Sequence, residues 1–221
     1  MDPFPTVPHE PYTPPEPPTA AARRFYEVMR QRRSIRDFST RPIDLEAVRL
    51  AVAAACTAPS GANKQPWRYV LVTDPALKRA IREGSEAEER EFYERRATPE
   101  WLADLAPLGT DTRKPFLETA PCLIVVFKLM KTDPDDHAVQ GRTYYVEESV
   151  GISVGLLLAS LHHAGFATLT HTPSPMAFLA RILGRPPHER PFLLIPVGHA
   201  AYHCRVPAIS RKPLAEVLVE R

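Results

Sequence analysis

The sequence feature that most constrains the fold is a continuous apolar run, APCLIVVFKLM, at residues 120–130. A strand with one face in water alternates apolar and polar residues, whereas a strand covered on both faces is apolar throughout. The run therefore predicts a central strand of a sheet that is covered on both faces. Three more strands are predicted, at residues 69–73, 166–172 and 192–198.

Helices are predicted between these strands. One is expected at residues 20–32, one after Asp44, and one from Asp74-Pro75, since each start carries a capping residue. A long apolar helix is expected at 144–163, and a shorter one from Ser174-Pro175 to Gly184. Gly151 and Gly155 remove the side chains from one face of the long helix, so another helix or a symmetry mate could approach it there.

The N-terminal segment, residues 1–18, contains eight prolines and is predicted to be an extended arm, because proline removes amide donors and fixes the backbone. Two interpretations remain open: a disordered tail, or an arm docked on a partner subunit. Phe4, Val7 and Tyr12 offer apolar anchors and favour the docked arm. Residues 19–221 are then expected to form one domain.

Charge and cysteine content exclude several classes of function. The 28 basic and 26 acidic residues are interspersed, which leaves no basic stripe for a nucleic acid. The three cysteines lack CxxC spacing, so neither a disulfide framework nor a cysteine zinc site is expected. No signal peptide is apparent, and the longest weakly polar run, at about 150–161, is too short to span a bilayer. We expect a cytoplasmic protein without a membrane or nucleic-acid partner.

Common catalytic motifs are absent from the sequence. It contains no Gly-x-Gly-x-x-Gly, Walker or nucleophile-elbow pattern, so dinucleotide binding of the usual type, kinase and hydrolase activity are not indicated. The histidines lack HExxH spacing and supporting carboxylates, and no metal site is expected.

A basic cluster, Arg32, Arg33 and Arg36 around Ser34, is the most evident candidate for an anion site. Arginine binds phosphate oxygens in a bidentate manner, so the cluster together with Arg211 could hold one phosphate. A solvated helix end is an equally good interpretation of these residues alone. Ser60-Gly61 offers a hydroxyl and backbone amides, although such turns are mostly structural.

Several motifs occur together in one order: RRSIRDFS, TAPSGANKQPW, ETAPCLIVVFK, GFATLTHTP, LGRP, and VP followed by RKPL. From about Phe25 to Leu214 the sequence resembles the iodotyrosine deiodinase branch of the nitroreductase superfamily. The resemblance implies an α+β fold, with a mostly antiparallel central sheet flanked by helices. It also implies an intertwined homodimer that binds FMN at its interface.

The resemblance assigns roles to residues from four parts of the chain. The cofactor-binding residues would be Arg32, Arg33, Ser34, Ile35, Arg36, Pro59, Ser60, Gly61, Thr170, His171, Thr172 and Arg211. The arginines and Ser34 would hold the phosphate and ring edge of FMN, and Ser60 would contact the isoalloxazine. The Thr170 hydroxyl would approach the flavin N5 and favour one-electron steps; otherwise Thr170 is an ordinary strand residue.

Residues 83–96 are predicted to form a highly charged helix. By the resemblance, the charged segment at about 84–114 would form a lid over the substrate. Glu89 and Tyr93 are four residues apart and so lie on one face of a helix. By the resemblance, Glu89 would receive the substrate ammonium, Tyr93 would add a hydrogen bond and Lys114 would bind the carboxylate, while Ala62 would lie at the phenolate end. Taken without the resemblance, Glu89 and Lys114 would be surface charges. Tyr93 and Thr170 are the candidate catalytic residues.

The implied reaction is reductive removal of halide from iodotyrosine, and possible substrates include bromo- and chlorotyrosine. An external reductant is required, either NADPH or a reduced flavin or ferredoxin carrier, and the sequence does not distinguish these. A general NAD(P)H-dependent FMN nitroreductase or quinone reductase is the alternative enzyme. A flavin- or ligand-binding sensor is the alternative outside enzymology.

Overall fold

The computed structural model describes residues 6–132 and 141–221. They belong to two compact units, Met1–Arg32 and Arg33–Arg221. Unit 2 is built on a four-stranded antiparallel sheet with the strand order β1-β2-β4-β3. The strands are β1 (Trp67–Val72), β2 (Cys122–Leu129), β3 (Ala167–Thr168) and β4 (Glu189–Gly198). The predicted central strand is confirmed, because β2 pairs with both β1 and β4.

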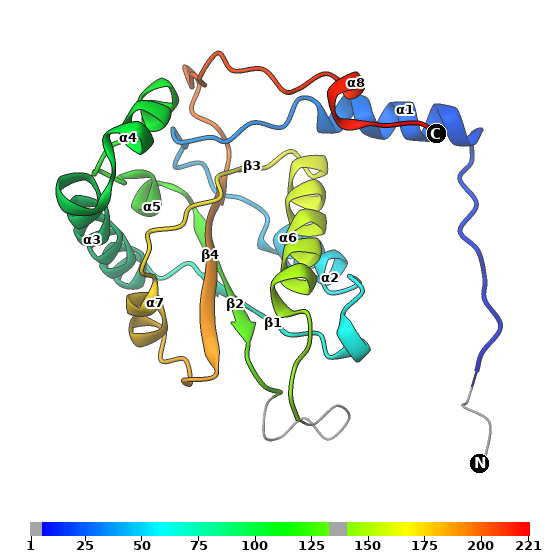
Figure 1. The fold of residues 1–221 in the computed structure, drawn as a ribbon, viewed down its shortest axis with the longest axis horizontal. Coiled ribbons are helices and arrows are strands. Elements are labelled where there is room, and N and C mark those ends of the chain that lie inside the picture. Colours follow the sequence, from blue (N-terminus) through cyan, green and yellow to red (C-terminus); the bar gives the residue numbers. More distant parts are fainter. Residues whose placement is uncertain (1–5, 133–140) are drawn as a thin grey trace. The chain divides into compact units, whose positions relative to one another are not determined.

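Both faces of β2 are buried, as its apolar run predicts. Alternate side chains enter two hydrophobic cores, one containing Cys122, Ile124 and Val126 and the other Leu123, Val125 and Phe127. The first core is closed by α2 (Leu45–Ala55) and α6 (Val146–His163). The second is closed by α3 (Pro75–Glu91), α5 (Phe116–Thr119) and α7 (Ala177–Ile182), which lie on the other side of the sheet (Figure 1). The predicted antiparallel sheet flanked by helices is thus confirmed.

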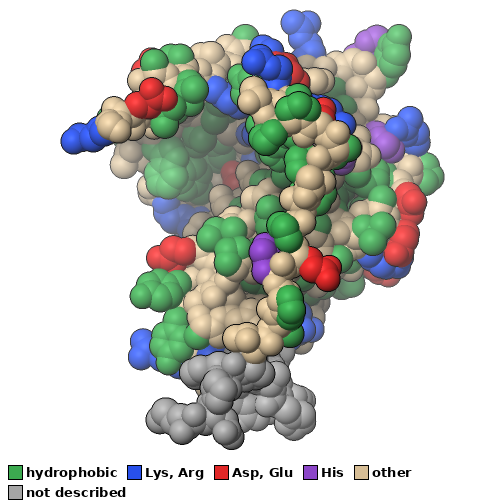
Figure 2. Space-filling model, turned by 90° about the vertical axis from the view of Figure 1, so that its right-hand side faces the viewer, with side chains coloured by type: hydrophobic (Ala, Val, Ile, Leu, Met, Phe, Trp, Pro, Cys, Tyr) green, Lys and Arg blue, Asp and Glu red, His purple; other side chains and the backbone are tan. Residues whose placement is uncertain are grey.

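Helix α6 is buried along one face and open along another. Ser149, Val150, Ser153 and Val154 are buried, whereas Ile152 is 48% exposed and Leu156 40% exposed. A Cβ atom added to Gly151 or Gly155 would meet nothing within 4 Å. Figure 2 shows the right-hand side of Figure 1, and hydrophobic side chains are visible on that surface. The glycine face expected to receive a neighbour is therefore solvent-exposed in the single chain.

The charged helix predicted at 83–96 differs from the structure in its last turn. Helix α3 starts at the expected Asp74 cap, whose carboxylate accepts from the Leu77 amide at 2.8 Å, but it ends at Glu91. Phe92–Arg96 form a π-helical turn, η2. The Arg96 guanidinium donates to the Glu88 carbonyl at 2.7 Å and lies 3.1 Å from its carboxylate. This contact bridges the wider turn back to α3, which a simple helical periodicity does not reveal.

The lid region continues as a short helix, α4 (Pro99–Leu105), and a 3-10 turn, η3 (Ala106–Leu108). The remaining short elements are a 3-10 turn, η1 (Gly61–Asn63), and α8 (Leu214–Val217). The Leu183–Pro186 motif has a structural role: Arg185 makes two hydrogen bonds, of 2.6 and 2.7 Å, to the buried carboxylate of Glu189. Arg68 of β1 adds a third at 3.2 Å. This ion cluster ties the end of α7 to the first residue of β4.

The strand predicted at 166–172 is interrupted. Only Ala167 and Thr168 pair as β3, and His171 forms a separate bridge with Leu194, through hydrogen bonds of 2.9 and 3.0 Å. Between them Leu169 is buried in the second core, whereas Thr170 is exposed. The break in pairing frees the Thr170 side chain from the sheet.

Unit 1 contains α1 (Pro18–Met29), which ends three residues before the predicted end at Arg32. Residues 6–17 form neither helix nor strand, in agreement with their proline content. Val7 and Tyr12 are exposed, and Phe4 lies outside the described residues. The predicted boundary after residue 18 lies within this unit, and docking of the arm on a partner stays a prediction. None of the described helices is long and apolar enough to cross a bilayer.

Gly84 determines how closely α3 approaches α7. A Cβ atom at this position would lie 2.5 Å from the Phe178 ring. We expect Gly84→Ala to lower the unfolding free energy by about 1–2 kcal/mol, because overpacking outweighs the better helix propensity of alanine. Chemical denaturation of wild type, Gly84→Ala, Phe178→Leu and the double variant measures this. If the alanine costs as much in the Phe178→Leu background as in wild type, the steric explanation is wrong.

Candidate functional site

The RRSIR motif runs beside β3, which brings Arg36 close to the Thr170 segment. Ser34 forms a parallel bridge with Thr168, and the Ile35 amide donates to the Thr168 carbonyl at 3.0 Å. Ile35 also packs against the second core, so the backbone of the motif is held firmly. Arg33 donates to the carbonyl of Pro207, four residues before Arg211. The motif and the C-terminal segment are therefore neighbours within unit 2, as the phosphate-site hypothesis requires.

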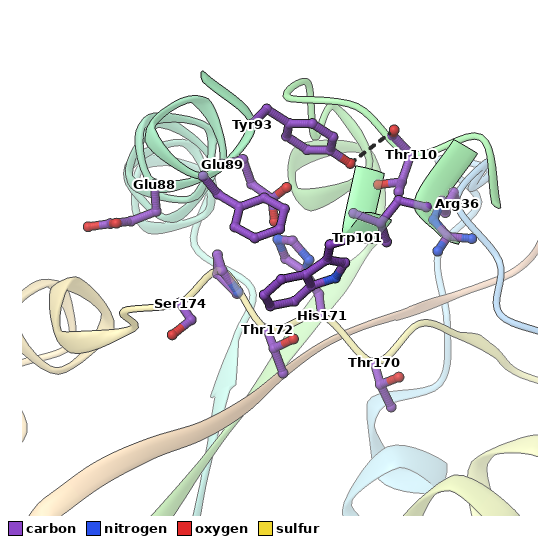
Figure 3. Close-up of a pocket in the computed structure, with 13 residues that line it drawn as sticks. Arg36, Glu88, Glu89, Tyr93, Trp101, Thr110, Thr170, His171, Thr172 and Ser174 are labelled. Atoms are coloured by element: carbon purple, nitrogen blue, oxygen red, sulfur yellow. Dashed lines mark hydrogen bonds between the residues drawn. The ribbon is translucent and has the colours of Figure 1, made fainter. Parts of the chain in front are cut away.

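A cavity of about 340 Å³ lies between this motif, the lid and the segment after β3 (Figure 3). Its size is in the range of small-ligand sites. It is lined by Arg36, Glu88, Glu89, Phe92, Tyr93, Trp101, Leu105, Thr110, Thr170, His171, Thr172, Pro173 and Ser174. Helix α3 and its π-helical turn, α4, and residues 170–174 supply most of the wall.

An ion pair joins the two predicted substrate-binding charges. The Lys114 ammonium lies 3.2 Å from the Glu89 carboxylate, and their side chains are 2% and 14% exposed. Lys114 also donates to the Thr110 hydroxyl at 3.3 Å and to the Asp111 carbonyl. Each charge of the pair neutralises the other. Glu89 and Lys114 are thus not independent surface charges.

Tyr93 lies in the π-helical turn and faces the same cavity as Glu89. Its hydroxyl donates to the Thr110 carbonyl at 3.0 Å, the hydrogen bond drawn in Figure 3. Burial raises the pKa of Tyr93, so its hydroxyl stays protonated at neutral pH and can donate a hydrogen bond. The expectation that Glu89 and Tyr93 share one side of the lid helix holds, although Tyr93 reaches the cavity from the wider turn.

His171 is a buried, neutral side chain in the cavity wall. Burial, and then the nearby charges of Lys114 and Arg36, lower the pKa of His171 to about 3. Its Nε2 atom is buried and has no hydrogen-bond partner in the described part of the chain. The Phe116 ring packs edge-on against the imidazole, at 5.8 Å between centroids. A buried polar atom without a partner beside a cavity indicates that a ligand can complete its hydrogen bonding.

Two further polar groups face the cavity. Arg36 is half-buried, yet within the described ranges neither its guanidinium nor the Thr170 hydroxyl makes a hydrogen bond or an ion pair. A half-buried guanidinium is suited to an anionic or carbonyl-rich ligand. Arg36, Thr170 and His171 therefore fit a polar ring system such as the isoalloxazine of FMN.

The Ser60 segment lies elsewhere. The Gly61 amide donates to Ser149 of α6 at 3.4 Å, and Ser60 accepts from the Gln65 amide at 2.9 Å. The segment lies with α2 and α6, on the face of the sheet opposite α3 and α7 (Figure 1). A Cβ atom on Gly61 would lie 2.9 Å from the Tyr144 carbonyl. It would lie equally close, at 2.9 Å, to the Tyr145 ring, so the segment just before α6 packs directly against Gly61.

The loop after Ser60 has a strained backbone. Ala62, Asn63 and Gln65 all have positive φ angles, of 50°, 52° and 45°. Left-handed conformations of residues other than glycine are uncommon and cluster at functional sites. This strain supports a functional role for the loop, although its residues do not line the cavity.

Unit 2 thus brings together part of the predicted site. Arg36, Glu89, Tyr93 and Thr170–Thr172 line one cavity, and Lys114 is joined to it through Glu89. Pro59, Ser60, Gly61, Ala62 and Arg211 are not among the residues that line it. Arg32 belongs to unit 1 and is described separately from this site.

The cavity wall also contains residues that no sequence motif indicates, among them Phe92, Trp101, Leu105 and Thr110. Trp101 packs edge-on against Phe92, at 4.8 Å between centroids. A signal for part of this wall is present: Thr98-Pro99 starts a helix, and the Thr98 hydroxyl accepts from the Trp101 amide at 3.2 Å. Trp101 and Leu105 are four apart and lie on the same side of that helix.

Comparison with known proteins shows the family of the chain. Residues 29–199 match the model of the nitroreductase family. An iodotyrosine deiodinase of Haliscomenobacter hydrossis is 53% identical over 206 residues, covering 93% of this chain and 92% of that protein. Iodotyrosine deiodinase 1 of Homo sapiens is 40% identical over 202 residues, covering 90% of this chain and 68% of that protein.

A solved structure supports the same assignment. The crystal structure of an oxidised iodotyrosine deiodinase bound to FMN and 3-iodo-L-tyrosine superimposes with a TM-score of 0.74 at 30% identity. It covers 86% of this chain and 96% of the solved chain. The chain therefore belongs to the nitroreductase family and, within it, to the iodotyrosine deiodinases.

Proposed function

We propose that this protein uses FMN to remove iodide reductively from mono- and diiodotyrosine, with bromo- and chlorotyrosine as further candidate substrates. The observation that carries the proposal is the Glu89–Lys114 ion pair, of which Glu89 lines the cavity. An amino-acid zwitterion carries one ammonium and one carboxylate, so it offers a partner to each member of the pair. A general nitroreductase has no need for this recognition, and we therefore place that activity second.

The residues of unit 2 that would hold FMN are Arg33, Ser34, Arg36 and Arg211 at its phosphate and ring edge, with Thr170, His171 and Thr172 along the ring. Their chemistry fits, because Arg36, the Thr170 hydroxyl and the His171 Nε2 are available for hydrogen bonds within the described chain. Arg32 and Ile35 belong to the same motif and would also contribute to FMN binding. Ile35 would do so through its backbone. Reduced FMN supplies the two electrons that, with a proton, replace the carbon–iodine bond by carbon–hydrogen and release iodide.

The chain's own residues bind and orient the substrate. Glu89 receives the ammonium, Lys114 receives the carboxylate, and Tyr93 adds a hydrogen bond to the zwitterion, whose ammonium can donate to the tyrosine oxygen. Phe92, Trp101 and Leu105 provide an apolar wall for the phenol ring and exclude water once the lid is closed. Thr170 supplies a hydrogen-bond donor at the flavin ring. Both Tyr93 and Thr170 thus act through hydrogen bonds, and no side chain is required as a covalent nucleophile.

We further propose that the complete site needs a homodimer. The loop with Pro59, Ser60, Gly61 and Ala62 lies on the other side of the sheet from the cavity, so a second copy would supply it. The open face of α6, with Gly151 and Gly155, is suited to close packing against that copy. Ser60 would then contact the ring of FMN, and Ala62 the phenolate end of the substrate. The strained loop backbone is consistent with this role.

Binding of a zwitterion exchanges one ion pair for two, and this gives the first test. A ligand with a single charge breaks the Glu89–Lys114 pair and leaves one buried charge without a partner, which costs about 3 kcal/mol. We expect wild-type holoenzyme to bind 3-iodotyramine and 3-(4-hydroxy-3-iodophenyl)propionate about a hundredfold more weakly than 3-iodotyrosine. Titrations that follow the absorbance of bound FMN measure the affinities.

Charge-removing variants provide the controls for this test. Lys114→Met should change the preference from iodotyrosine toward iodotyramine, and Glu89→Gln should change it toward the iodophenylpropionate. FMN should stay bound in both variants, because the two residues act on substrate charges. Equal loss of all three ligands in each variant would contradict recognition by exchange.

The dimer proposal gives a second test. We expect Ile152→Arg to convert a dimer into a monomer of 24.8 kDa and to release most FMN, because the charge enters a close helix contact. Ala177→Arg adds the same charge at an exposed position on α7 and should leave both properties unchanged. Analytical ultracentrifugation and flavin absorbance are the measurements. A monomeric wild type that retains FMN would refute the proposal.

A further inference from the structure

Lys114 is attached to α3 at two points, through its side chain and through its backbone. The ammonium pairs with Glu89, whereas the backbone amide donates to Oε1 of Glu86 at 2.7 Å. Glu86 and Glu89 are three residues apart and therefore project from the same side of the helix. One turn of α3 thus binds both the side-chain ammonium and the backbone amide of Lys114.

The second carboxylate oxygen of Glu86 is held by a network beneath the lid. Arg82 donates to Oε2 at 2.7 Å and also to the carboxylate of Glu118 on α5. Arg79 lies 3.9 Å from the other oxygen of Glu118. The side chains of Glu86, Arg82 and Glu118 are 17%, 26% and 34% exposed, so this network is partly buried. The Glu86 carboxylate thus accepts with one oxygen from the Lys114 amide and with the other from Arg82.

We propose that Glu86 is a positioning residue for substrate recognition, which fixes the backbone of Lys114 while Glu89 releases its ammonium. This inference rests on the proposed function. When a zwitterion enters, Glu89 takes the ligand ammonium and the Lys114 side chain turns to the ligand carboxylate. The Glu86 contact is not used by the ligand and persists. It keeps Lys114 from moving away with the loop at 109–113 when its ion pair opens.

Two conservative variants separate this role from a general structural one. Glu86→Gln retains an amide oxygen at the same reach for the Lys114 amide but loses the charge that pairs with Arg82. Glu86→Asp retains the charge but is one methylene shorter, so it cannot reach both partners. A positioning role requires that Gln be tolerated and Asp not, whereas a role limited to the Arg82 ion pair requires the opposite order.

The first readout is ligand affinity of the oxidised FMN-loaded protein. We expect Glu86→Asp to weaken 3-iodotyrosine binding about ten- to a hundredfold, the loss of a hydrogen bond to a charged group, and Glu86→Gln to stay within about threefold of wild type. Binding of 2-iodophenol, which carries no zwitterion, should be unchanged in both. Glu83→Ala is the matched control, because Glu83 also lies near Arg82, at 3.7 Å, and its carboxylate is well exposed. The proposal is overturned if Asp binds iodotyrosine like wild type, or if both ligands weaken together.

The second readout does not depend on the substrate. Amide hydrogen exchange, followed by mass spectrometry on the ligand-free holoprotein, should speed up in peptides covering 110–116 for Glu86→Asp and not for Glu86→Gln. Unchanged exchange in Glu86→Asp would overturn the proposal that Glu86 fixes the Lys114 backbone. If wild type binds no iodotyrosine while the exchange pattern is as expected, the proposed function is wrong. The role of Glu86 in fixing the Lys114 backbone is then still supported.

Discussion

The structure depends on the burial of β2 from both sides. Its alternate side chains enter two cores, and each core must be closed by helices because an exposed apolar face is unfavourable in water. The two sets of helices then serve different purposes. Helices α3 and α7 support the cavity with the lid, whereas α2 and α6 support the Ser60 loop. A sheet that is buried in this way separates the two parts of the predicted site within one chain.

Much of this architecture could be predicted from local sequence. The apolar run predicts the central strand, and Asp44 and Asp74 mark helix starts that the structure confirms. The π-helical turn at Phe92–Arg96 could not be predicted, because it depends on the Arg96–Glu88 contact rather than on periodicity. The break after Thr168 was missed for a related reason. Alternation of residues in the sequence does not show where a strand loses its pairing partner.

The site was predictable to a lesser degree and by a different route. Residue types and spacing alone left Glu89 and Lys114 as surface charges, and the resemblance to a family gave them a common ligand. The structure adds that they pair with each other, which neither source indicated. Glu86 and Arg82 were not expected because their importance depends on a backbone amide 28 residues away from Glu86. Trp101 had a weaker signal, since its helix begins with a recognisable cap.

The pairing of Glu89 with Lys114 also affects how a ligand finds the cavity. Two opposite charges 3.2 Å apart act at long range as a dipole, and the field of a dipole decreases faster with distance than that of a single ion. The lid pair therefore contributes little to electrostatic steering of a zwitterion from solution, which is itself neutral overall. Its attraction develops after encounter, at contact distance and largely out of water. Recognition by this pair is thus expressed in how long a ligand stays, rather than in how fast it arrives.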